Sequence, residues 1–261
     1  NFGRWSLALL ILLPFCGKDL WRQRKIICQK WPIILVLGLL AITTYNTFLY
    51  LAAHSTTAIN ITLVGCTLPV MTMVASSFLL ASRPTRWQLL GLSIALSGVV
   101  VIVSKGNLSV LFSLEDNSGD IMIFGISCCW ALYSVLIRKY PLELKATTLL
   151  TTLIIAGMPI LLMLATLEWL LVPSAGLRIR DFPVYLYLAI FPSILSLLFW
   201  GYGVKILGPA IASISSYSMP LFAAILSIIL LNESLALYHL FGSVMIFIGL
   251  YFGSIFQQLS K

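Results

Sequence analysis

One stretch of the chain decides its fold class. Residues 31–82 read WPIILVLGLLAITTYNTFLYLAAHSTTAINITLVGCTLPVMTMVASSFLLAS and contain no Asp, Glu, Lys or Arg. A helix needs about 20 apolar residues to cross the hydrocarbon core of a membrane, so this stretch is long enough for two crossings joined by a tight turn. Because the run is continuously apolar and does not alternate, it favours membrane helices over the strands of a membrane β-barrel.

The composition of the whole chain agrees with this interpretation. Of its 261 residues, 60% are hydrophobic and 9% are charged, whereas an average soluble domain has about 25% charged residues. So few charges cannot coat a soluble globule, which excludes a soluble enzyme, a DNA-binding module and a disordered protein. The net charge of +8 does not indicate nucleic acid as a partner, because the basic residues lie beside the apolar stretches. We predict an all-α integral membrane protein.

Working outward from residues 31–82, the uncharged stretches predict eight full membrane helices. These are residues 32–53, 56–81, 87–104, 119–138, 146–168, 183–204, 209–231 and 236–257. Residues 2–15 look like part of a ninth helix that stops near Pro14, so we expect about nine transmembrane helices. Residue 1 is Asn and not Met, and we expect that the start of this helix and what preceded it are missing.

The basic residues predict the orientation. Lys and Arg near short loops gather on the cytoplasmic side of a membrane. If residues 2–15 end in the cytoplasm, twelve Lys and Arg fall on that side, and only Arg4, Lys105, Arg178 and Arg180 fall outside. The basic run at residues 18–30 is interpreted as this topology signal, with some attraction to anionic lipid. We expect the C-terminus in the cytoplasm.

The chain contains an internal repeat. Residues 65–104 and 216–255 align without a gap, and the alignment pairs Pro69 with Pro220 and two glycines of each segment (Gly91 with Gly242, Gly98 with Gly249). A repeat of this kind predicts two related halves, here residues 1–105 and 118–258. An odd number of helices in each half would invert the second half in the membrane. The charges agree, because the Arg-containing turn before residue 87 and the Glu-containing turn before residue 236 then lie on opposite sides.

Four features together carry a family resemblance. They are WALY at residues 130–133 followed by Arg138 and Lys139, prolines inside two helices, LLNE at residues 230–233, and paired glycines in the helix that follows each turn. In this order they resemble the EamA-like family of the drug/metabolite transporter superfamily. The chain departs from the family pattern at residues 82–84, where SRP replaces the acidic turn of the first repeat.

The resemblance implies both an architecture and a function. The family is similar in having ten helices in two inverted five-helix repeats, so the first repeat here lacks its first helix. The implied function is a multi-pass transporter that moves a small organic metabolite or drug by alternating access, with the lipid bilayer and a small-molecule substrate as its partners and no cofactor. We expect the chain in a bacterial inner (plasma) membrane, as a monomer or a homodimer.

The paired prolines are candidate hinges. Pro69 and Pro220 fall near the centres of their predicted helices, where proline removes a backbone hydrogen bond and kinks the helix. Inverted-repeat transporters place their substrate site near this depth. We interpret the two prolines as hinges and part of a cavity wall. The alternative is a kink that serves only helix packing.

Polar and aromatic side chains at the same depth are candidate substrate contacts. We predict substrate binding by Thr43, Asn46, Tyr50, Thr67, Trp130, Tyr133, Trp200, Ser216 and Tyr217. The hydroxyls have an alternative role, because Ser and Thr bond readily to carbonyls of their own helix. The aromatic rings could equally be core residues or interfacial anchors. Asn46 is the strongest candidate, because its amide has four hydrogen-bonding positions to fill.

The sequence predicts no catalytic residue and no metal site. His54 and His239 have no companions at ligand spacing, and the five cysteines lack the spacing of a zinc site. An intramembrane lipid-modifying enzyme therefore remains only a weak alternative, and a non-transporting truncated remnant is a second one. No charged residue lies in the central part of a full predicted helix, so we predict a facilitator or exchanger unless a missing helix carries the coupling group. Finally, Gly242, Gly249 and Gly253 predict close helix packing within the bundle, with dimerisation left open.

Overall fold

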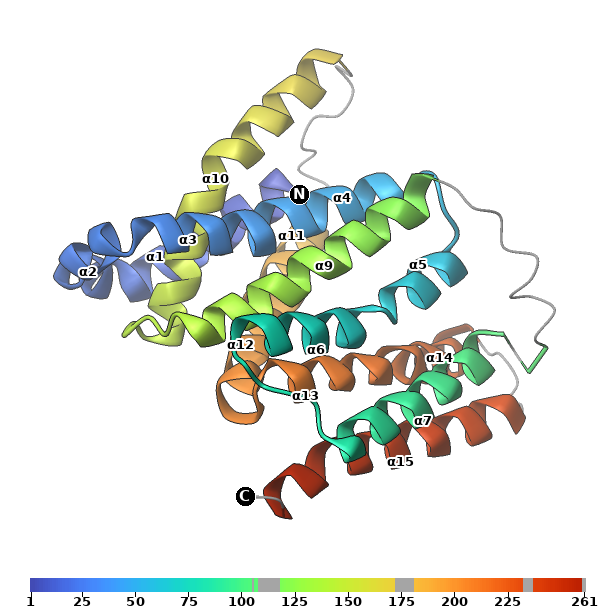
Figure 1. Ribbon diagram of the computed structural model, residues 1–261. Helices are drawn as coiled ribbons and strands as arrows, with labels where there is room; N and C mark the ends of the chain where they lie inside the picture. The colour runs from blue at the N-terminus through green and yellow to red at the C-terminus, as the bar shows by residue number, and fades with distance from the viewer. Residues whose placement is uncertain (105, 108–117, 172–180, 232–236, 260–261) are drawn as a thin grey trace. The chain divides into compact units, whose positions relative to one another are not determined.

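The computed structural model describes residues 1–104, 106–107, 118–171, 181–231 and 237–259. These residues form helices and short connections, and no strand occurs among them (Figure 1). The first part of the chain forms α1 (Phe2–Arg22), α2 (Arg24–Gln29), α3 (Trp31–Gly38), η1 (Leu39–Thr44), α4 (Tyr45–Ala52), α5 (Ala58–Gly65), α6 (Leu68–Leu79) and α7 (Arg86–Val103). The second part forms α9 (Ser118–Lys139), α10 (Ala146–Leu171), α11 (Phe182–Ala189), η3 (Ile190–Leu195), α12 (Ser196–Leu207), α13 (Pro209–Ile214), η4 (Ser215–Ser218), α14 (Met219–Leu231) and α15 (Leu237–Leu259). The all-α prediction is confirmed.

Six helical stretches among the described residues are long and apolar enough to cross a membrane. They are Trp31–Ala52, Asn60–Leu79, Arg86–Val103, Ser118–Lys139, Ala146–Leu171 and Phe182–Leu207. Their bounds lie close to those predicted from the uncharged stretches. The remaining two predicted stretches are also helical. Residues 209–231 form α13, η4 and α14, and residues 237–257 lie in α15.

The first helix corrects one expectation. Residues 2–15 were predicted to end near Pro14, whereas α1 continues through Pro14 to Arg22 and is 21 residues long. A proline inside a helix removes one hydrogen bond and need not end the helix when packing on other elements supports it. Here α1 packs against α10 and α11, and these contacts extend it beyond the predicted stop.

Elements of the two parts of the chain begin at a constant separation of 151 residues, the separation at which residues 65 and 216 align. The pairs of starting residues are Trp31 and Phe182, Leu39 and Ile190, Ala58 and Pro209, and Leu68 and Met219. The second of these pairs begins two π-helical segments, η1 and η3. Because π-helix is rare in proteins, its occurrence at matching positions is a specific sign of relatedness.

The chain forms two compact units, and each takes segments from both parts of the sequence. Unit 1 comprises Asn1–Thr47 and Leu136–Ile206. In it, α10 packs against α1, α3 and η1. Glycines make the contact with α3 and η1 close, because a Cβ atom at Gly38 would lie 2.7 Å from the Leu153 carbonyl oxygen and one at Gly157 would lie 3.0 Å from the Ile42 Cβ. A side chain at either position would separate the helices.

Unit 2 comprises Phe48–Val135 and Leu207–Lys261, and its main contact is between α7 and α15 (Figure 1). A Cβ atom at Gly91 would lie 2.5 Å from the Gly249 carbonyl oxygen, and one at Gly98 would lie 2.6 Å from the Gly242 carbonyl oxygen. Because the residue number rises along one helix as it falls along the other, the two helices are antiparallel. The prediction that these glycines pack within the chain is confirmed.

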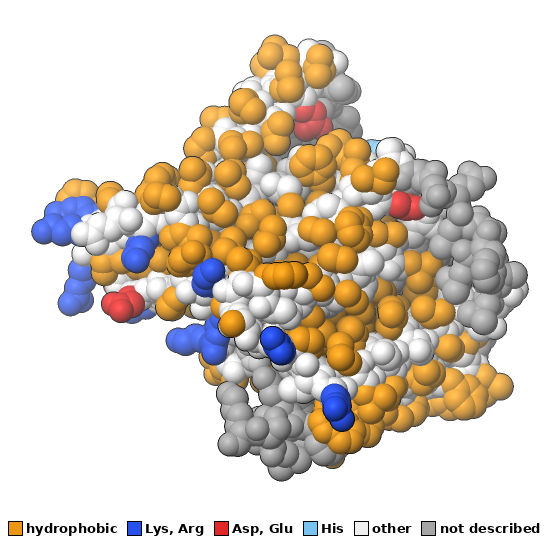
Figure 2. Space-filling view, viewed as in Figure 1, with side chains coloured by type: hydrophobic (Ala, Val, Ile, Leu, Met, Phe, Trp, Pro, Cys, Tyr) orange, Lys and Arg blue, Asp and Glu red, His pale blue; other side chains and the backbone are white. Residues whose placement is uncertain are grey.

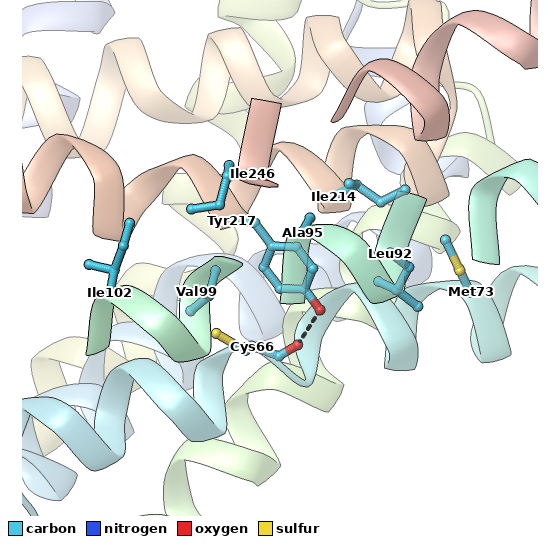
Figure 3. Close-up of a cluster of buried hydrophobic side chains, with 9 residues drawn as sticks. All are labelled: Cys66, Met73, Leu92, Ala95, Val99, Ile102, Ile214, Tyr217 and Ile246. Carbon is cyan, nitrogen blue, oxygen red and sulfur yellow. Dashed lines mark hydrogen bonds between the residues drawn. The ribbon is translucent and has the colours of Figure 1, made fainter. Parts of the chain in front are cut away.

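The buried cluster of unit 2 lies beside this helix pair. It comprises Cys66, Met73, Leu92, Ala95, Val99, Ile102, Ile214, Tyr217 and Ile246 (Figure 3). Apolar side chains cover much of the face shown in Figure 2. Phe15, Phe78 and Ile121 are among the large apolar side chains that are exposed. A surface of this kind is compatible with lipid and not with water.

Candidate functional site

Two of the helices are interrupted next to the paired prolines. In the first, α5 ends at Gly65 and α6 begins at Leu68, with Pro69 in its first turn. In the second, the 3₁₀ segment η4 separates α13 from α14, and Pro220 is the second residue of α14. Proline has no N–H to donate and is well tolerated in the first turn of a helix, so both prolines fix a place where a new helix starts. The sequence predicted a kink at Pro69 and at Pro220, and in the structure the α-helix is interrupted beside both; their role as hinges stays a prediction.

A hydrogen bond joins the two interruptions. The Tyr217 hydroxyl in η4 donates to the carbonyl oxygen of Cys66, between α5 and α6, at 2.8 Å (Figure 3). Tyr217 is 1% exposed and Cys66 is 7% exposed. The two residues are 151 positions apart, which is also the separation of the matching elements. Carbonyl groups at a helix interruption need donors when water is excluded, and Tyr217 supplies one of them.

The small hydroxyl residues at the interruptions bond locally. Thr67 donates its hydroxyl hydrogen to the Val64 carbonyl oxygen at 2.7 Å, and Ser216 donates to that of Ser213 at 2.7 Å. Ser215 and Ser218 bond in the same way to carbonyls three residues earlier. This is the alternative stated above for individual Ser and Thr residues. Thr67 and Ser216 therefore offer a substrate only the acceptor positions of their oxygens.

The aromatic candidates of unit 2 have different environments. Trp130 and Tyr133 are buried in α9, and their ring centroids lie 5.3 Å apart, which confirms that they share one face of the helix. Tyr50, near the end of α4, is 40% exposed. The tilted rings of this buried pair attract each other at this distance, which holds them in one geometry.

The unit 1 candidates are centred on Asn46. Its Oδ1 atom accepts a hydrogen bond from the Arg4 guanidinium at 2.9 Å, and its Nδ2 atom donates to the Ala41 carbonyl oxygen at 3.4 Å. Ala41 lies in the π-helical segment η1, where the hydrogen-bonding register of the helix shifts. Thr43, in the same segment, donates to the Gly157 carbonyl oxygen of α10 at 3.2 Å. Trp200 is half-buried in α12.

Arg4 is a polar group whose burial the sequence did not indicate. It is 6% exposed among the helices of unit 1 and lies 5.0 Å from the centre of the Trp5 ring. Its assignment to the outer side of the membrane stays a prediction. Because α1 extends to Arg22, Arg4 lies at the opposite end of the helix from the basic residues. An arginine in the first turn of an apolar helix was the signal available in the sequence.

Asp120 is a second polar group that the sequence did not single out. One of its carboxylate oxygens accepts a hydrogen bond from Thr56 at 2.5 Å, and the other accepts one from Asn60 Nδ2 at 2.9 Å. The contact is close because Gly119 has no side chain, and a Cβ atom there would lie 2.7 Å from the Thr56 Cβ. The pair Gly119 and Asp120 at the start of a predicted helix was the available signal. In the structure these bonds tie the start of α9 to the start of α5.

Some predicted features lie outside the described residues. These are Lys105, Arg178, Arg180, Asn232, Glu233 and Lys261. Within the described ranges, no group of three or more His, Cys, Asp and Glu side chains is placed to hold a metal ion.

The helices are those of a multi-pass membrane protein, and the comparisons with known proteins give its class. The sequence model of the EamA-like transporter family matches residues 1–104 and 117–255. The chain belongs to the EamA-like transporter family.

Relatives support the same class. The chain is 24% identical to the uncharacterized transporter YyaM of Bacillus subtilis over 95% of this chain and 80% of the relative. It is 29% identical to an uncharacterized transporter of Archaeoglobus fulgidus over 96% and 85%. It is also 28% identical to the uncharacterized inner membrane transporter YedA of Escherichia coli K12 over 77% and 63%.

A solved structure titled "Crystal structure of protein" has a similar fold. Its TM-score is 0.77 at 18% identity, with 98% of this chain and 87% of the other covered. At this identity the likeness shows the fold alone. The family match, the similar transporters and the membrane-length helices together identify the protein as a membrane transporter.

Proposed function

We propose that this protein carries a small organic metabolite or drug across the membrane by alternating access, with its two halves arranged as inverted repeats. Three observations support the arrangement: the constant separation of matching elements, the antiparallel contact of α7 with α15, and the family match in two segments. In inverted-repeat carriers the substrate site lies near the bilayer midplane, and one repeat moves against the other around it.

The observation that carries the proposal is the hydrogen bond from Tyr217 to Cys66. Residues separated by 151 positions are equivalent in the two repeats, so here a residue contacts its own equivalent. When two copies are related by a two-fold axis, such a self-contact occurs only close to the axis. The glycines support the same axis, because the contact of Gly91 with Gly249 becomes that of Gly242 with Gly98 when the repeats are exchanged.

An axis through the two helix interruptions gives them a role in transport. The regular α-helical bonding pattern is interrupted in both helices, so the segments on either side of each interruption can change their relative angle more easily than a continuous α-helix can. We propose that Pro69 and Pro220 define these hinges. The substrate contacts remain those predicted from the sequence.

The test is a transport assay with a panel of metabolites and drugs. Accumulation and efflux would be measured in cells that express the full-length protein, with Asn46→Ala, Trp130→Ala and Tyr217→Ala beside the wild type. The matched controls are Trp169→Ala and Tyr202→Ala, because these aromatic side chains are 60% and 64% exposed and face away from the packed interior of their units.

We expect at least one solute to be transported by the wild type and both controls but lost in the three site variants. If the site variants transport it normally at equal protein levels, the site assignment is wrong while the fold stands. If no solute moves with the wild type or with any variant, the proposal that this protein carries a solute of the tested classes is wrong.

A further inference from the structure

A basic surface lies where α1, α2 and α3 meet in unit 1. Lys18, Arg22, Arg24, Lys25 and Lys30 are exposed there, and so are two tryptophans, Trp21 at 72% and Trp31 at 38%. We call these seven residues the basic turn. The short helix α2 at its centre contains no buried residue. In Figure 2 blue side chains gather around α2.

A carboxylate next to the basic turn, that of Asp19, is already paired. Asp19 accepts a hydrogen bond from Lys145 at 2.8 Å, and their side chains are 27% and 68% exposed. Lys145 comes from the start of α10, so Asp19 neutralises a cation from another element and not one of the five in the turn. The five cations therefore retain their attraction for anions in solution or in the membrane.

The contacts of Arg24 hold its guanidinium in a position where it can bind an anionic group. Its guanidinium carbon lies 4.4 Å from the centre of the Trp21 ring, and one of its N–H groups donates to the Trp21 carbonyl oxygen at 3.0 Å. These contacts restrain the guanidinium at the surface of the turn. Arginine has five N–H donors in a planar arrangement that matches the oxygens of a phosphate group. The remaining donors can therefore bind a phosphate without first losing the freedom of a flexible side chain.

The location of the turn identifies the source of that phosphate. Trp31 begins a membrane-length helix, so the turn lies at the boundary between lipid and water. Tryptophan prefers this level of a membrane because its ring is apolar and its N–H is polar. A group of four to eight Lys and Arg beside a membrane helix is the usual feature that attracts anionic lipid headgroups.

We propose that the basic turn is a binding site for the headgroup of an anionic phospholipid, with Arg24 on the phosphate and the neighbouring cations around it. The site lies apart from the residues proposed to contact the transported solute. It makes the stability of unit 1 depend on the lipid composition of the membrane.

The experiment uses the full chain reconstituted in vesicles of phosphatidylcholine, with or without phosphatidylglycerol. The readouts are the Tm of the protein and the lipid molecules retained in native mass spectrometry. A ligand that binds only the folded protein raises its Tm, so we expect phosphatidylglycerol to raise the wild-type Tm and to be retained preferentially. Arg24→Gln combined with Lys25→Gln should abolish both effects and leave the Tm in phosphatidylcholine unchanged, because both side chains are exposed.

Two further variants make the test specific. Arg83→Gln combined with Arg86→Gln removes the same charge from another exposed turn and should retain the response to phosphatidylglycerol. Trp21→Leu should weaken retention of the lipid with the net charge unchanged. The proposal is overturned if the two double variants lose the response equally, since net charge alone would then explain it, or if phosphatidylglycerol has no effect on the wild type.

Discussion

The Tyr217 hydroxyl supports a carbonyl group of another helix at a place where that helix is interrupted. In an apolar medium a buried carbonyl without a donor is unfavourable. Single hydrogen bonds between membrane helices nevertheless contribute little on average, about 0.6 kcal/mol, because the unfolded helices in the membrane also find partners. The effect of removing one hydroxyl should therefore be measurable and modest.

We predict that Tyr217→Phe lowers the free energy of unfolding by about 1 kcal/mol. We also expect it to slow transport by each folded molecule, beyond any loss of folded protein. The ring stays in its buried place, and only the bond to Cys66 is lost. Thermal unfolding in detergent and a transport assay at matched protein levels measure the two effects. Tyr202→Phe is the control, because Tyr202 is 64% exposed; an equal loss in both variants would contradict the prediction.

Arg4 and Asn46 form the second residue-scale test. Asn46→Ala removes the acceptor of the buried guanidinium, and we expect a loss of about 1–3 kcal/mol of stability, as for other hydrogen bonds to charged groups. In a background of Arg4→Gln the same substitution should have a smaller effect, because the partner charge is already gone. A double-mutant cycle by thermal or denaturant unfolding measures the difference. Strict additivity of the two changes would show that the bond contributes no stability.

At the scale of elements, the packing of α7 on α15 depends on glycine. A Cβ atom at Gly98 would lie 2.6 Å from a backbone oxygen of α15, and backbone cannot move aside as a side chain can. The contact therefore requires the absence of a side chain, and the two helices approach at backbone distance.

We predict that Gly98→Val lowers stability by about 1–3 kcal/mol or more, the usual effect of overpacking, and reduces the amount of folded protein in membranes. Gly125→Val is the matched control in α9, because nothing lies within 4 Å of a Cβ atom there. Fluorescence-detected size-exclusion chromatography and thermal unfolding would measure both variants. A similar loss at Gly125 would attribute the effect to valine in a helix and not to the helix contact.

At the scale of the whole molecule, antiparallel packing makes a prediction about membrane topology. Because α7 and α15 run in opposite directions, their first residues should lie at opposite membrane surfaces. Ser82→Cys places a thiol before α7, and Leu237→Cys places one in α15 near its N-terminal end. Both positions are exposed. With the five native cysteines replaced by serine, an impermeant thiol reagent should label position 237 in intact cells and position 82 only after permeabilisation. Labelling of both from the same side would contradict the inverted arrangement.

The sequence predicted the helices well and the polar contacts poorly. The apolar stretches at residues 31–52 and 146–171 are set by the thickness of the membrane, so their lengths follow from composition alone. The bonds of Arg4 with Asn46 and of Asp120 with Thr56 and Asn60 join residues far apart in sequence. Such pairs depend on helix packing and rotation, which a hydropathy pattern does not contain. The paired prolines located the helix interruptions, because proline acts on its own backbone.

The glycine contact between α7 and α15 also limits where the protein can deform. Where two backbones touch, there are no rotamers to exchange and no side chains to slide past one another, so the contact has no second arrangement of similar energy. These two helices should move together as one rigid body during the transport cycle. Bending is then left to segments such as those beside Pro69 and Pro220, where the regular α-helical pattern is already interrupted.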